Sequence, residues 1–422
     1  MRILARPTGQ ALQKGHSARL VHLLLVAGLY ALAFGLIKPA VPLFAVSIGA
    51  SAFVIGAYAS VGTAVNALLR PTSGRLSDST NRQGVMLLGL AIAAVSVTSL
   101  LIVRLPWALL GVGAGVGAGA AAFWPSLKAG AVEALGGGER PAAALGVVSS
   151  SQFGASAVGQ VAGGALLSGA GYRAVFGAAA VCLFGAMAVS GGLRHRPTGG
   201  GRETARDTAP VPNGTRASEQ PADLTSPRSV TRARLLADGV TLFFLGVAVG
   251  GFLPFLPVYM RQVLHANVAL IGVSLAVFSG ANVLGGLSVD RVKTLSRGLL
   301  PAGAVVPVLL AVASGLLVAK GVSPLVGFVA AGALLAFSVT IIQVLVTAGL
   351  VGASSGGIAR KIGLMDSSTL AGALCGPMVG AAAYASDPRW LFPVCAVSAL
   401  AAAAVASAAP TLERMRTRSL TP

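Results

Sequence analysis

Long apolar stretches separated by short polar segments are the dominant pattern of this sequence. A membrane-spanning α-helix needs about 20 consecutive, mostly apolar residues to cross the hydrocarbon core of a bilayer. The pattern predicts twelve such helices, at about residues 21–46, 51–73, 85–103, 105–131, 141–168, 172–193, 234–260, 267–287, 298–319, 322–348, 360–384 and 389–409. We therefore expect an all-α membrane protein.

One longer polar segment divides the chain. Residues 194–233 are rich in Pro, Gly, Thr, Arg and Glu and contain almost no large apolar side chain, so they cannot bury a core. We interpret them as a flexible linker between two bundles of six helices, at 21–193 and 234–409. A basic N-terminal arm (1–20) and a polar, basic tail (410–422) complete the chain.

An internal repeat supports the division into halves. Three features recur in the same order at offsets of 212 to 217 residues: Pro39-Ala-Val-Pro42 and Pro254-Phe-Leu-Pro257, Gly74 to Asp78 and Gly286 to Asp290, and Gly159 with Gly163 and Gly376 with Gly380. Paired halves with a site between them are a common transporter design, in which one half rocks against the other. The repeat thus favours a transporter over an enzyme.

The excess of basic residues indicates how the chain is oriented in the membrane. The chain has 31 Lys and Arg residues against 12 Asp and Glu, a net charge of +19. In a chain that is 55% hydrophobic and 10% charged, such an excess indicates membrane topology rather than nucleic-acid binding. With the N-terminus inside, 25 of the 31 lie on the inner side and 5 on the outer side. We expect both termini in the cytoplasm and the chain in the inner (plasma) membrane.

The same composition excludes a soluble enzyme, a disordered chain and a disulfide scaffold. The three cysteines, Cys182, Cys375 and Cys395, lie in apolar segments without metal-ligand spacing. We expect no metal and no cofactor. No ATP-binding domain is evident, so an ion or solute gradient would supply the energy.

The segment after the second predicted helix reads Gly74-Arg-Leu-Ser-Asp78-Ser-Thr-Asn81-Arg82-Gln-Gly. It resembles the major facilitator superfamily signature Gly-x-Leu-x-Asp-Arg-x-Gly-Arg-Arg. Asn81 stands where Gly is usual, and Asn also tolerates a left-handed backbone. Ser79 and Gln83 replace basic residues. The second copy keeps Gly286, Asp290 and Arg291 and then diverges.

This resemblance implies a gating role for Asp78 and Arg82, which would latch the two halves together in the state open to the outside. A carboxylate beside a helix N-terminus is favoured by the helix dipole, and a nearby Arg adds a charge-assisted hydrogen bond. The alternative is that both are ordinary loop charges that set topology.

Two departures from proton-coupled exporters of this superfamily stand in the first half. Such exporters often carry an Arg one turn before a Gly-rich stretch in helix four, where this chain has Trp107 before Gly111 to Gly119. Their helix five often contains Gly-Pro-x-x-Gly-Gly, and here Gln160 replaces the proline. Both departures weaken the case for proton antiport. The glycines at every fourth position of helix four are expected to pack against neighbouring helices.

Lys38 lies about 17 residues into the first predicted helix. A charge at a helix centre in the bilayer costs about 2.5–3.5 kcal/mol on the insertion scale, so this side chain needs water or a partner. One interpretation is a cavity cation that attracts anionic or carboxylate-bearing substrates. The other is a lysine that snorkels to the outer vestibule.

Other polar residues within the predicted helices have two possible roles. Asn66, Gln152, Asn282 and Gln343 could line a substrate site or hydrogen-bond across helices. Asp366 and Asp238 could carry protons, because desolvation raises the pKa of a carboxylate, or could pair with nearby basic residues.

Together these features predict secondary active transport of a small organic molecule. Overall similarity to efflux members favours export of a drug-like or amphipathic metabolite by proton exchange, by a monomer in the lipid bilayer. The alternative is an importer or facilitator of a nutrient such as a sugar or an organic anion. A transporter-like sensor or assembly factor is a third possibility.

Overall fold

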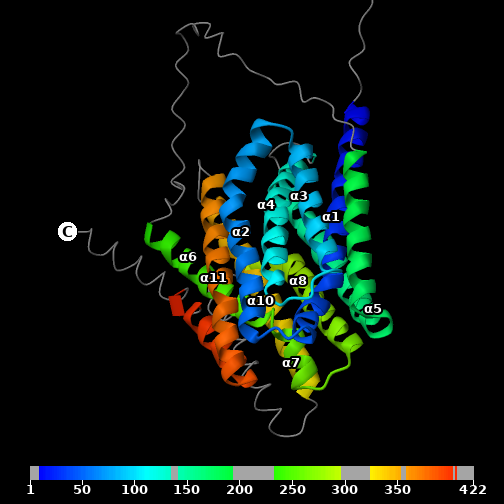
Figure 1. Cartoon of the computed structure of the whole chain (residues 1–422). Coiled ribbons are helices and arrows are strands. Elements are labelled where there is room, and N and C mark those ends of the chain that lie inside the picture. The colour runs from blue at the N-terminus through cyan, green and yellow to red at the C-terminus, as the bar shows by residue number, and fades with distance from the viewer. Residues whose placement is uncertain are drawn as a thin grey trace, which may run out of the picture.

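The computed structural model describes residues 9–134, 141–192, 232–295, 324–352, 358–402 and 404–405. All regular structure within these ranges is helical. The helices are α1 (Gly9–Ser47), α2 (Ala52–Ser79), α3 (Arg82–Ser99), α4 (Ala108–Ala134), α5 (Pro141–Gly191), α6 (Arg232–Phe252), α7 (Leu256–Gln262), α8 (Val268–Leu295), α10 (Pro324–Gly352) and α11 (Ile358–Ser386), with a 3-10 turn, η1, at Pro388–Trp390 (Figure 1). A further apolar helix covers Pro388–Ala402.

The helices coincide with the predicted apolar stretches, apart from 298–319, which lies outside the described residues. The stretches 141–168 and 172–193 form the single long element α5, which bends at Gly171. The backbone φ of Gly171 is 76°, a left-handed value that side chains disfavour, so glycine is the residue suited to this turn.

The repeated proline pairs behave differently in the two halves. Pro39 and Pro42 lie inside α1, which continues through both of them. The stretch predicted at 234–260 is instead broken, because α6 ends at Phe252 and α7 begins at Leu256. The predicted membrane span is confirmed as Leu236–Gln262, but a short turn between α6 and α7 interrupts its helix. Pro257 is in the first turn of α7, where its missing N–H costs no intrahelical bond.

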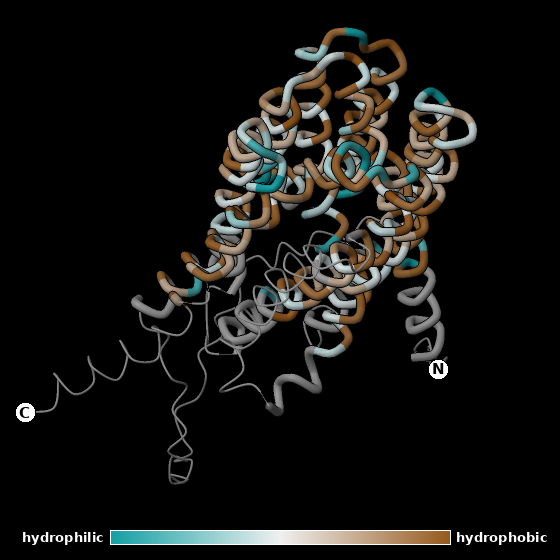
Figure 2. Tube along the Cα trace, turned by 90° about the horizontal axis from the view of Figure 1, so that it is seen from below, coloured by the Kyte–Doolittle hydropathy of each residue, from teal (hydrophilic) through white to brown (hydrophobic). Residues whose placement is uncertain are grey.

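Seven of the described helices are long and apolar enough to cross a membrane, and one of these is the bent α5. Hydrophobic residues run along the helical segments in Figure 2. Many also face outward: Leu68, Ile102 and Val181 are each at least 70% exposed. Such a surface would be unfavourable in water and suits contact with lipid chains.

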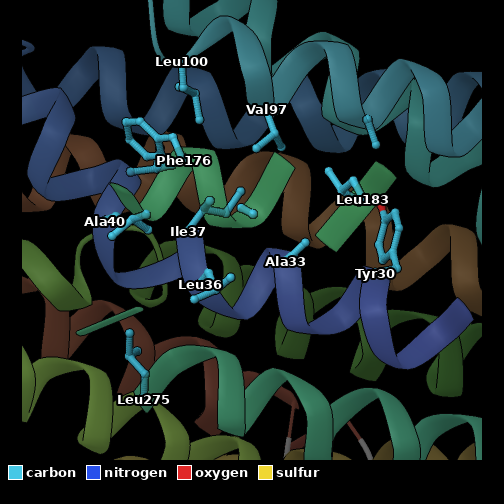
Figure 3. Packing of buried hydrophobic residues seen from close by; sticks show 14 of the residues in the cluster. Tyr30, Ala33, Leu36, Ile37, Ala40, Val97, Leu100, Phe176, Leu183 and Leu275 are labelled. Carbon is cyan, nitrogen blue, oxygen red and sulfur yellow. The ribbon is translucent and has the colours of Figure 1, made fainter. Parts of the chain in front are cut away.

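The core of the first half is built on α1 (Figure 3). Tyr30, Ile37 and Ala40 of α1 are buried together with Val97 of α3 and Phe176 of α5. The helices approach closely where small residues meet, and a β-carbon added to Gly159 of α5 would contact the α1 backbone. Close backbone approach through glycine is the usual basis of helix packing in a bilayer, where apolar burial gives no advantage over lipid.

Following the division expected from the sequence, we call α1 to α5 the first half and α6 to α11 the second. The halves meet mainly through α5 against α8 and α2 against α11, and Figure 1 shows α2 beside α11. We name the two ends of the bundle by their turns. The α1–α2 end contains the turn at residues 48–51 and the bend of α5. The α2–α3 end contains the turn at residues 80–81.

Candidate substrate cavity

A cavity between the two halves contains Lys38. Its volume is about 80 Å³, enough for a small head group rather than a whole drug-sized molecule. Among the described lining residues, Lys38 alone comes from the first half; the others come from α6 (Val249, Phe252, Leu253), α8 (Leu275, Phe278, Ser279, Asn282) and α10 (Gly332, Leu335, Ala336, Val339). Lys38 is exposed, whereas Ile37 and Pro39 on either side of it are buried. The lysine therefore opens onto the cavity that the second half supplies.

The polar groups of this cavity favour an anion. Lys38 makes no hydrogen bond or ion pair with any residue that the structure describes, and the lining contains no carboxylate among those residues. Asn282 accepts a hydrogen bond from the Thr340 hydroxyl (2.7 Å) through its Oδ1, which leaves the amide NH₂ as a donor. An ammonium and an amide donor, surrounded by apolar and aromatic walls, suit an anionic group attached to an apolar body.

A buried hydrogen bond joins the cavity wall to the opposite half. Ser279 of α8, which lines the cavity, donates to Oε1 of Gln160 on α5 at 3.0 Å. The Gln160 amide in turn donates to Ser156 Oγ, one turn earlier on α5, at 3.2 Å. Gln160 is 0% exposed and Ser279 is 2% exposed, so water does not compete for this bond.

Near the α1–α2 end, the two halves are in backbone contact. A β-carbon added to Gly164 of α5 would lie 2.9 Å from the Cα of Gly272 on α8, and one added to Gly56 of α2 would reach the carbonyl of Pro377 on α11. The Ser60 hydroxyl of α2 donates to the Leu374 carbonyl of α11 at 2.8 Å. This end is closed.

At the α2–α3 end, the signature residues have a different setting. Gly74 of α2 and Gly286 of α8 both have open space where a β-carbon would point. Helix α2 continues to Ser79, so Asp78 belongs to its last turn rather than to a loop. Asp290 and Arg291 likewise fall within α8. The side chains of Asp78, Asp290 and Arg291 lie outside the described set, and the latch stays a prediction.

Asn81 differs from the expectation for the signature turn. Its backbone is extended (φ −104°, ψ 107°), not left-handed, and its side chain caps α3 by accepting from the Gln83 N–H at 3.0 Å. Gln83 also donates to the Ser190 carbonyl at the end of α5 (2.7 Å). Arg82, the first residue of α3, is half-buried. A helix cap and a side-chain bond thus fix this turn at the positions where the signature has Gly and Arg.

Four other predicted site residues, Asn66, Gln152, Gln343 and Asp238, are not among the described cavity lining. Asn66 on α2 is half-buried with its Oδ1 unbonded, Gln152 on α5 is half-buried, and Gln343 on α10 is exposed. Asp238 is half-buried near the start of α6, and Asp366 lies in α11 with its side chain outside the described set. Of the predicted cavity residues, the structure brings together Lys38 and Asn282.

Comparisons with known proteins agree with this architecture. The sequence matches the Major Facilitator Superfamily over residues 23–359. The chain belongs to this superfamily. It is therefore a multi-pass membrane transporter, and the fold expected from the sequence is confirmed.

Solved structures of superfamily members share its fold. A bacterial homologue of the human lysosomal transporter Spinster, in an inward-facing and occupied conformation, is 16% identical with a TM-score of 0.72 over 94% of this chain and 97% of that one. The nucleoside transporter NupG is 13% identical with a TM-score of 0.71 over 92% and 98%. No curated protein matches the sequence.

Within this superfamily fold, sequence reasoning missed the functional potential of Gln160 and Ser279. In the sequence, Gln160 stands out only because it replaces the proline of the helix-five motif. Its partner is 119 residues away on the other half, and a single sequence carries no signal for such a pairing. An uncharged amide in a glycine-rich membrane helix, at the position of a motif residue, is the one clue that the pattern offers.

Proposed function

We propose that this superfamily member is a secondary active transporter that exports a small organic molecule, by exchange with protons, through alternating access. The Lys38 cavity between the halves carries this proposal, together with closure of the α1–α2 end. The substrate is a molecule with an anionic group, which Lys38 attracts, and an apolar or aromatic body, which Phe252 and Phe278 contact. The protein acts as a monomer in the plasma membrane.

The α2–α3 end faces the cytoplasm in this proposal, with both termini on that side. The positive-inside distribution of Lys and Arg supports this orientation. The conformation is then inward-facing, as is that of the Spinster homologue. Asp78 and Arg82 would join the halves when the protein turns outward, and Asp366 or Asp238 would carry the proton.

The second candidate is an importer or facilitator of a nutrient such as an organic anion. The absence of a carboxylate from the described cavity lining favours it, because a proton-exchanging site usually needs a titratable acid within reach. Trp107 and Gln160, in place of the exporter Arg and Pro, point in the same direction.

Export is tested by growth of an efflux-deficient bacterial host on a panel of toxic compounds. The intact protein is expected to protect against at least one compound, and Asp78→Asn to abolish that protection by removing the latch charge. Asp387→Asn is the matched control, because Asp387 lies at the opposite end, where it caps η1, and Asn also caps. Equal protection by Asp78→Asn, at equal membrane expression, would contradict the latch.

A panel without any protected compound would instead favour import. The next measurement would then be accumulation of carboxylate-bearing solutes by whole cells. Uptake dependent on the protein would establish the second candidate, and neither export nor uptake would leave the sensor interpretation.

The Gln160–Ser279 bond is expected to favour the conformation closed at the α1–α2 end. Gln160→Leu and Ser279→Ala should each shift the equilibrium toward opening by about threefold, the average worth of a hydrogen bond between membrane helices. The double variant should shift no further than either single one, because both remove the same bond. Ser156→Ala, which removes only the bond within α5, is the control.

Distances between spin labels measure this equilibrium. Labels at Ser168→Cys on α5 and Leu270→Cys on α8 lie on exposed positions of opposite halves near the α1–α2 end, after replacement of the three native cysteines by serine. A larger long-distance population in both single variants supports the role of the bond. Fully additive shifts, or an effect of Ser156→Ala as large as that of Gln160→Leu, would disprove it.

A further inference from the structure

A second cavity lies on the first half at the α1–α2 end, away from Lys38. Its volume is about 680 Å³, within the range of small-molecule sites. Three segments line it: the end of α1 (Phe44, Ile48), the chain between α3 and α4 (Leu100 to Arg104) and the part of α5 after its bend (Tyr172, Arg173, Phe176). The transport cycle described above does not use it.

Two arginines give this cavity a positive charge. Arg104 and Arg173 both line it, and both side chains are exposed. Neither guanidinium makes a hydrogen bond or ion pair with a residue in the described part of the chain. An arginine presents its N–H donors as a planar fork that matches the oxygens of a phosphate, and two such forks in one cavity reinforce each other.

Exposed apolar residues surround the two arginines. Ile102 is 78% exposed, Leu105 is 71% exposed and Trp107 is 61% exposed, all in the segment that joins α3 to α4. Tryptophan is enriched where hydrocarbon meets the head groups. Inside the cavity, Phe44 packs against Tyr172 and Phe176, with ring centroids 5.4 and 5.2 Å apart. This combination of exposed arginines, an exposed tryptophan and apolar surface is typical of the boundary between head groups and acyl chains.

We propose that this cavity binds the head group of an anionic phospholipid, with Arg104 and Arg173 on its phosphate. Charge complementarity selects an anionic lipid over a zwitterionic one, because two cations face one binding site. The exposed apolar residues select a lipid over a soluble phosphate, which would gain nothing from them. The bound lipid would join the α3–α4 segment to α5 in the leaflet at the α1–α2 end.

Native mass spectrometry of the full chain in mixed phosphatidylglycerol and phosphatidylcholine micelles tests this site. The wild-type protein should retain phosphatidylglycerol in preference to phosphatidylcholine. The double variant Arg104→Gln, Arg173→Gln should retain it about thirtyfold less tightly, since each basic residue near anionic lipid contributes roughly a fivefold gain in binding. Arg389→Gln, an exposed arginine of the second half near the same end, is the matched control and should bind as the wild type does.

A further arm adds inorganic phosphate to the lipid-bound protein. Loss of phosphatidylglycerol in the double variant, with retention in Arg389→Gln and no displacement by phosphate, supports the proposal. Equal retention by the double variant would overturn it, as would displacement by phosphate alone, which would indicate a soluble anion site. Circular dichroism of each variant checks that the helices are intact. The lipid-binding result does not depend on the direction of transport.

Discussion

Lys38→Gln is expected to slow transport of an anionic substrate by tenfold or more while the protein folds normally. Lys38 is the cation of the described cavity lining, and hydrogen bonds to a charged group are worth about 1.5–3 kcal/mol, or about tenfold to a hundredfold in binding. The helix should tolerate the change, because a neutral amide costs less than a charge within the bilayer. Transport of a carboxylic acid and of its uncharged amide, measured in proteoliposomes, gives the comparison.

The charge specificity separates cavity binding from snorkelling. Lys38→Gln should affect the acid and spare the amide, and Lys38→Arg, which keeps the charge, should retain most of the acid transport. Unchanged kinetics for both compounds in Lys38→Gln would mean that the lysine only reaches toward water and that the substrate binds elsewhere.

Gly164→Leu is expected to abolish transport by preventing closure of the α1–α2 end. A β-carbon at this position would already lie 2.9 Å from Gly272 Cα and 3.1 Å from the Val268 carbonyl, and a leucine cannot fit without separating α5 from α8. The variant should still insert and fold, because the obstruction lies between the halves and not within one.

Gly169→Leu is the matched control, since it lies on the same helix with open space where its β-carbon would point. In Gly164→Leu, the spin labels at residues 168 and 270 should show only the long-distance population. In Gly169→Leu, they should show the wild-type distance distribution. A wild-type distribution in Gly164→Leu would show that the two helices need not approach so closely during transport.

Helix positions could be predicted from the sequence because bilayer crossing depends on an intrinsic property, a run of apolar residues of sufficient length. The break between α6 and α7 could not. The proline pair at 254 and 257 has the same spacing as the pair at 39 and 42, yet only the former accompanies a break. Neighbouring helices decide whether the bonds lost at proline are compensated, and the local sequence does not contain that information.

The lining of the candidate cavity was partly predictable for a similar reason. The high cost of a charge in the bilayer singled out Lys38. Polar amides within apolar helices are also unfavourable, and this criterion selected Asn282 together with three residues that are not in the described cavity lining. The rotation of each helix about its axis separates these cases, and apolar helices without clear polar faces do not reveal that rotation. Asn81 was placed correctly at the turn, but its role as a cap depends on the exact start of α3.

The contrast between the two proline pairs has a mechanical consequence. Because α1 is one uninterrupted rod, Lys38 must travel with the whole first half and keeps a fixed height relative to it. The cavity residues Phe252 and Leu253, by contrast, stand at the joint where α6 gives way to the seven-residue α7. If the proposed substrate binds here, the turn between α6 and α7 would let Phe252 and Leu253 shift with its size, while Lys38 would stay fixed on the uninterrupted α1.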